Sequence, residues 1–234
     1  MSESNIEAPL QKEKKIQYNN DPDKIKYITF DQFQSIIKEA KKASTRDYAL
    51  LMISYYHGLR ISEVSKLQIT DYDEQTQRIR IRRAKGGLGH VYKVAEECAL
   101  ALKKWLIIRG KQEGPLFPSR RSIMAEDCLG VSKRQLDTIF KEYAQAAGIP
   151  EELQHFHTLR HGIAVRMVDK DIPLRQIQDW LGHRSIQSTE VYAKVSDKAR
   201  NRTADLLFLK DEDKEKVSRG TIKRIDWGKD KKGK

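Results

Sequence analysis

The sequence is poor in cysteine and has no long apolar run. Its two cysteines, Cys98 and Cys128, lack a C-x-x-C spacing, so we predict neither a disulfide framework nor a thiolate zinc site. No apolar run approaches the about 18 residues of a membrane-spanning helix, and residues 1–15 lack the apolar core of a secretory signal. These absences favour a protein of the reducing cytoplasm.

The sequence is rich in positive charge. Lysine and arginine total 45 of the 234 residues against 33 acidic residues, which gives a net charge of +12. Such a chain attracts polyanions, so DNA, RNA and an anionic membrane surface are the candidate partners. A membrane is the least favoured of the three, because the strongest apolar run, Ala49–Tyr56, has the length of a core helix.

Periodicity divides the chain into a polar arm, residues 1–26, a folded domain, residues 27–209, and a charged tail, residues 210–234. Helical spacing predicts helices within 30–42, 45–57, 59–67, 96–110, 132–148, 157–170, 173–182 and 188–195. Between Gln77 and Val94 the spacing is that of strands, with a turn at 85–89, which predicts a β-hairpin with a basic tip. The expected fold class is α+β, mainly α-helical, with a small antiparallel β-sheet.

The candidate functional residues are basic, with one tyrosine among them. They are Arg60, Lys85, His157, Arg160, His183 and Tyr192. His157 and Arg160 are three residues apart at a helix start, so both side chains can project into one cleft. His183 follows Gly182 at a helix end, where the imidazole can point away from the packed face.

Four segments resemble the catalytic domain of tyrosine recombinases, also called phage-type integrases. They are HGLRISEV, HTLRHGIAVRMV, IQDWLGHRSIQSTEVYAKVS and the lysine-bearing hairpin, in the family's order over residues 28–196. The resemblance implies a site-specific recombinase that breaks and rejoins DNA through a covalent 3'-phosphotyrosyl intermediate, without metal or nucleotide cofactor. It further implies double-stranded DNA as partner, a homotetramer on paired DNA sites, accessory DNA-bending proteins and a cytoplasmic, nucleoid-associated location.

The resemblance gives each candidate residue a role. Arg60 and Arg160 match the family's two arginines, His157 the first histidine of H-x-x-R, Lys85 the hairpin lysine, His183 a histidine or tryptophan position, and Tyr192 the nucleophile. Glu63 matches an acidic residue that supports the first arginine.

Apart from the resemblance, the chemistry of phosphodiester cleavage also requires these residue types. Displacing an alkoxide from a phosphodiester builds negative charge on the nonbridging oxygens, which two guanidinium groups can hold. A tyrosine with an ordinary pKa of about 10 needs nearby cations and a proton acceptor, for which His157 is the best candidate. Lys85 can protonate the leaving 5' oxygen as general acid, and His183 can hydrogen-bond the phosphate.

Other interpretations of single residues stay open. Arg82, Arg83 and Lys93 share the hairpin with Lys85 and are expected to contact DNA phosphates. Lys85 could likewise be only a phosphate contact. Tyr192 could pack beside Val191 and Val195. His155, His157 and His161 could bind a metal, although the arginine among them would repel a cation; otherwise His161 is expected to be structural.

Three other functions compete with a recombinase: a type IB topoisomerase, a non-catalytic DNA-binding regulator, and a metal-dependent nuclease or transposase. Most family members carry a core-binding domain before the catalytic domain, whereas only about 27 residues precede the first predicted helix here. The chain therefore resembles either the minority made of a catalytic domain alone or an excised domain. The apolar segment 204–210 is expected to dock either in cis or on a neighbouring protomer.

Overall fold

The computed structural model describes residues 25–83, 89–119 and 129–195. Its helices are α1 (Phe30–Ala43), α2 (Thr45–Tyr56), α3 (Ile61–Val64), α4 (Glu96–Arg109), α5 (Lys133–Ala146), α6 (His157–Asp169), α7 (Leu174–Leu181) and α8 (Gln187–Val195). The strands are β1 (Tyr72–Asp73), β2 (Arg78–Ile81) and β3 (His90–Lys93), which form one antiparallel sheet in the order β1-β2-β3. The predicted fold class is confirmed.

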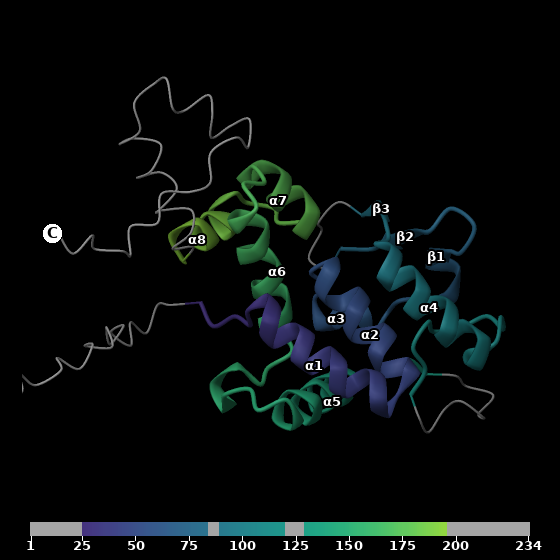
Figure 1. Cartoon of the computed structure of the whole chain (residues 1–234). Helices are drawn as coiled ribbons and strands as arrows, with labels where there is room; N and C mark the ends of the chain where they lie inside the picture. Colours follow the sequence, from purple (N-terminus) through teal and green to yellow (C-terminus); the bar gives the residue numbers. More distant parts are fainter. Residues whose placement is uncertain (1–24, 84–88, 120–128, 196–234) are drawn as a thin grey trace, which may run out of the picture.

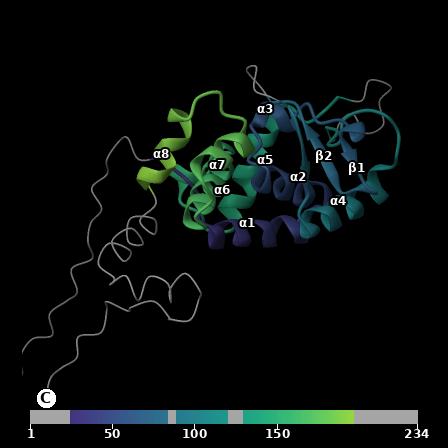
Figure 2. The same ribbon diagram turned by 90° about the horizontal axis from the view of Figure 1, so that it is seen from above.

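The sheet and the last three helices lie at opposite ends of the molecule. Figures 1 and 2 show β1–β3 beside α4 at one end and α6–α8 at the other, with α1–α3 between them. Segments far apart in the sequence meet where α2 packs against α6 and where the end of α2 contacts α7. Among the described helices, none is long and apolar enough to cross a membrane.

Local sequence signals set the bounds of the first two helices. Thr29 and Gln32 form the predicted capping box at the start of α1, which buries Phe33, Ile36, Ile37 and Ala40. The chain reverses after α2 at Gly58, whose φ of +54° lies in the left-handed region. A Cβ atom at this position would also lie 2.4 Å from Leu181 Cδ2, so the glycine permits close approach of α7.

The hairpin follows the predicted alternation. Ile79 and Ile81 are buried, while Arg78 and Arg80 are exposed, and Ile79 pairs with Tyr92 of β3. Lys85 belongs to the tip, residues 84–88, which lies outside the described residues.

Helices α6 and α7 bury most of the apolar positions that the sequence predicts as core. Ile163, Ala164, Met167, Val168, Ile177 and Leu181 are buried, and Leu174 is half-buried. Gly162 lets α6 approach the segment before α1, since a Cβ there would lie 2.5 Å from the carbonyl oxygen of Ile28. This packing fixes the start of α6, which carries two of the candidate residues.

Candidate active site

Five of the six candidate residues come together where α3, α6, α7 and α8 meet. Arg60 is the residue before α3, His157 and Arg160 lie in the first turn of α6, His183 follows α7, and Tyr192 is on α8. The charges of Arg60 and Arg160 both act on the pKa values of His157, His183 and Tyr192. The sixth candidate, Lys85, lies outside the described residues.

Glu63 holds Arg60 in place. Its Oε1 accepts a hydrogen bond from Arg60 Nη1 at 2.9 Å, and its Oε2 accepts one from the Arg60 backbone N–H, also at 2.9 Å. The Glu63 side chain is 1% exposed and that of Arg60 is 23% exposed. A buried carboxylate thus orients a guanidinium group that reaches the surface.

Arg160 is buried at the junction of α2 and α7. Its Nη1 donates to the carbonyl oxygen of Gly58, and its Nη2 donates to that of Leu181 at 2.9 Å. Burial, and next the positive charge of Arg60, lower the pKa of Arg160 to about 9, so the group stays charged at neutral pH. The two guanidinium groups give the candidate site a fixed positive charge.

The histidines of the candidate site are neutral at pH 7. Burial is the larger cause, and the positive charge of neighbouring arginines the smaller one, that lowers the pKa of His183 to about 3. The same two causes lower the pKa of His157. His183 Nδ1 lies 2.9 Å from Oγ1 of Thr189, which is fully buried on α8. This contact connects the end of α7 to the helix that carries Tyr192.

Tyr192 is 2% exposed, and its hydroxyl contacts a histidine other than the expected one. Tyr192 Oη lies 3.0 Å from Nδ1 of His161, and its ring stacks near His183 with 6.3 Å between ring centroids. Burial raises the pKa of Tyr192, against the lowering effect of Arg160 and Arg60. The phenol is therefore protonated, covered and hydrogen-bonded.

Sequence reasoning missed His161 as a partner of Tyr192. The available signal was its spacing of four residues from His157, which puts both on one face of α6. Their rings are 4.5 Å apart and nearly perpendicular. Burial, followed by His157 and Arg160, lowers the pKa of His161 to about 4, so its imidazole is neutral and can accept a proton.

The three hairpin residues expected to bind DNA lie in different environments. Arg82 is exposed and pairs with Asp71 at 2.7 Å, and Lys93 is exposed. Arg83 is 6% exposed, and its guanidinium group contacts protein atoms. The alternation of β2 carried this signal, because position 83 continues the face of Ile79 and Ile81.

A sequence model of the phage integrase family matches residues 26–199. The chain belongs to the phage integrase family. FimB of Escherichia coli strain K12, a type 1 fimbriae regulatory protein, is 32% identical over 174 residues, 74% of this integrase and 86% of FimB. The tyrosine recombinase XerA of Pyrococcus furiosus is 30% identical over 173 residues, 74% of this chain and 58% of XerA.

Solved structures agree with this assignment. A crystal structure of XerA recombinase superimposes with a TM-score of 0.69 at 27% identity, covering 80% of this chain and 66% of XerA. A lambda integrase dimer bound to a COC' core site has the same fold, with a TM-score of 0.57 at 20% identity over 74% of this chain and 49% of that one. The resemblance and the enzyme class, a tyrosine-type site-specific recombinase, are confirmed.

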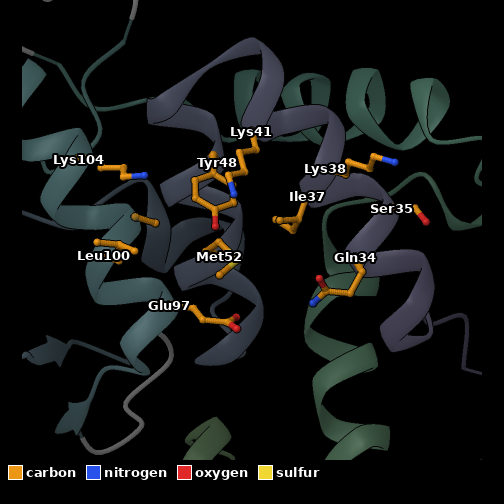
Figure 3. A pocket seen from close by; sticks show the side chains of 11 residues that line it. Gln34, Ser35, Ile37, Lys38, Lys41, Tyr48, Met52, Glu97, Leu100 and Lys104 are labelled. Carbon is orange, nitrogen blue, oxygen red and sulfur yellow. The ribbon is translucent and has the colours of Figure 1, made fainter.

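A large cavity of this integrase lies apart from the candidate residues. It has a volume of about 610 Å³ and lies between α1, α2 and α4 (Figure 3). Ile37 and Met52 contribute apolar surface, and Lys38, Lys41 and Lys104 contribute positive charge. None of the eight described residues that the sequence predicts to act on DNA lines it, so its volume is no guide to the chemistry.

Proposed function

We propose that this integrase cleaves and rejoins double-stranded DNA at specific sites through a covalent 3'-phosphotyrosyl bond to Tyr192, without metal or nucleotide cofactor. The observation that carries the proposal is that two arginines, Arg60 and Arg160, lie close enough for their charges to act on the Tyr192 phenol. Solved neighbours bound to DNA, among them lambda integrase on its core site and XerH on its difH substrate, support double-stranded DNA as the partner.

The reaction forms a bond between Tyr192 Oη and phosphorus and breaks the bond from phosphorus to the 5' oxygen. Arg60 and Arg160 stabilise the negative charge that grows on the nonbridging oxygens, and His183 donates a hydrogen bond to the phosphate. The phenol proton passes to a neutral histidine, either His157 or His161, whose Nδ1 lies 3.0 Å from Tyr192 Oη. Lys85 gives a proton to the leaving 5' oxygen.

Tyr192 must become accessible before it can attack. At 2% exposure its hydroxyl is covered, and it hydrogen-bonds to His161. We propose that DNA binding shifts α8 and releases this contact, so that the phenol can lie in line with the scissile bond. Nucleophile exposure is then coupled to assembly on the correct substrate.

The remaining features of the proposal concern the whole assembly. Residues 27–209 act as the catalytic domain, between an arm of residues 1–26 and a tail of residues 210–234. A homotetramer on two paired DNA sites exchanges the strands, with accessory DNA-bending proteins as further partners. The protein acts in the cytoplasm, at the nucleoid.

The decisive experiment is a search for a covalent protein–DNA adduct. Sheared genomic DNA of the source organism is incubated with the protein in EDTA, SDS-resistant complexes are sequenced, and a nicked suicide duplex is built from the enriched site. Tyr192→Phe should abolish the adduct and leave DNA binding intact, whereas Tyr72→Phe, a buried tyrosine on β1, should change neither. An adduct in Tyr192→Phe would remove Tyr192 as nucleophile, and activity that disappears with EDTA would indicate a metal-dependent nuclease.

The role of Lys85 has a separate test. Lys85→Ala should slow cleavage of ordinary DNA far more than cleavage of DNA with a 5'-bridging sulfur, because a thiolate leaves without a proton. Equal slowing of both substrates would contradict the general-acid role and indicate a phosphate contact.

A further inference from the structure

Arg83 follows β2 and is held by protein groups on several sides. Its Nη1 donates to Glu63 Oε2 at 3.0 Å, and its Nη2 donates to the carbonyl oxygens of His57, at 3.3 Å, and Trp180. Its guanidinium carbon lies 5.1 Å from the centre of the Tyr92 ring, and its side chain is 0% exposed. A DNA phosphate cannot reach this group as placed, so a direct DNA contact does not explain it.

One contact of Arg83 leads to Arg60. Glu63 Oε2 accepts from both Arg83 and the Arg60 backbone N–H, while Oε1 accepts from the Arg60 guanidinium group. Arg83 therefore fixes the orientation of the carboxylate that orients Arg60. Without Arg83, Glu63 loses one of the partners that hold it in that rotamer.

The other hydrogen bonds of Arg83 have acceptors next in sequence to those of Arg160. Arg83 binds the carbonyl groups of His57 and Trp180, and Arg160 binds those of the next residue in each segment, Gly58 and Leu181. The two guanidinium groups thus connect the end of α2 to the end of α7 at adjacent peptide groups. Because these carbonyls lie at helix ends, they have no intrahelical donor to satisfy them.

Arg83 also packs against the turn that carries His183. A Cβ atom on Gly182 would lie 2.6 Å from Arg83 Cγ, so only glycine permits the observed contact. His183 is the next residue, and its backbone N–H donates to the carbonyl oxygen of Gln178 at 3.0 Å. The position of the His183 turn is therefore set in part by the side chain of Arg83.

From these contacts we propose that Arg83 is a positioning residue, which holds Arg60 through Glu63 and holds the His183 turn through Trp180 and Gly182. Arg83 thereby holds these residues in one rigid arrangement before DNA binds, which a reaction that depends on preorganised charge requires. This role inside the protein takes the place of the DNA contact that the sequence predicts for Arg83. The role in cleavage rests on the proposed function.

Two variants of Arg83 and one matched control test the proposal. Arg83→Lys keeps the charge but cannot span Glu63, His57 and Trp180, and Arg83→Met removes the charge. Arg80→Lys makes the same change at an exposed position of β2, three residues before Arg83. Adduct formation is measured with saturating protein on the nicked duplex, and DNA affinity is measured over a salt series.

We expect Arg83→Lys to slow adduct formation by roughly tenfold to a hundredfold, since a misplacement of about 1 Å can cost that much. Its affinity for DNA and the salt dependence of that affinity should match the wild type, and Arg80→Lys should cleave at the wild-type rate. A salt slope reduced by about one, with normal cleavage at saturation, would make Arg83 a phosphate contact and overturn the proposal. Failure of both Arg83 variants to fold would make it a structural residue and overturn it equally.

A measurement without DNA separates this proposal from the proposed function. Hydrogen exchange at the Gly182 and His183 amides should be faster in Arg83→Lys than in the wild type, while the amides of α2 keep their protection. Unchanged exchange at both amides would contradict the positioning role. A wild-type protein that forms no adduct would count against the proposed function, and the exchange result would still decide on Arg83.

Discussion

Replacing Glu63 with glutamine tests whether a buried carboxylate holds the two arginines next to it. The substitution keeps the shape of the side chain and removes its charge. Glu63 is 1% exposed and lies 2.9 Å from Arg60 Nη1 and 3.0 Å from Arg83 Nη1, whose own side chain is 0% exposed. The variant leaves Arg83 as a buried charge without its carboxylate.

The expected loss follows from burial. Removing one partner of a buried ion pair typically costs about 3–5 kcal/mol of unfolding free energy. The amide oxygen of glutamine still accepts one hydrogen bond, and Arg83 keeps its two carbonyl acceptors, so we expect the lower end, about 3 kcal/mol. Glu39→Gln is the matched control, because Glu39 lies 2.8 Å from Lys42 but both side chains are more exposed, at 30% and 60%. That exposed pair should contribute about 0.5 kcal/mol or less.

The assay is urea denaturation of both variants and the wild type, with the midpoint and the slope fitted together. A lower midpoint at constant slope for Glu63→Gln, with Glu39→Gln near the wild type, is the expected result. Equal losses of under about 1 kcal/mol in both variants would refute the reasoning, because burial would then not decide the strength of the pair.

Two further substitutions concern histidines. His57 is 1% exposed and stacks on Trp180, and neither of its ring nitrogens has a hydrogen-bond partner among the described residues. Burial, followed by Arg83, lowers the pKa of His57 to about 3. Between pH 6.5 and 3 the unfolded chain therefore binds a proton that the folded protein excludes, so this group lowers the unfolding free energy by up to about 1.4 kcal/mol per pH unit as the pH falls. His57→Phe should flatten that loss, and pH–stability curves that stay parallel down to pH 4 would contradict it. His161→Phe leaves the buried Tyr192 hydroxyl without its hydrogen-bond partner, which favours an outward phenol. Nitration of Tyr192, mapped by mass spectrometry, should then become several-fold faster. An unchanged nitration rate would show that this hydrogen bond does not hold Tyr192 inward.

The sequence by itself determined the local elements and the set of candidate residues. The Thr29 capping box, the Gly58 reversal and the alternation of Ile79 and Ile81 each depend on neighbours within a few residues, so they follow from local chemistry. Family membership also followed from the sequence, because the motifs at residues 57–64, 157–168 and 177–196 occur in a fixed order.

Only the tertiary structure decided which partner each polar group has. Arg82 and Arg83 are neighbours of one residue type, yet one is exposed and the other is enclosed by Glu63 and the end of α7. Likewise, helical spacing puts His161 and His157 on one face of α6, but the placement of α8 makes His161 the partner of Tyr192. The physical reason is that sequence spacing determines on which face of its own helix or strand a residue lies. Its burial and its hydrogen bonds depend on which distant segments pack against that face.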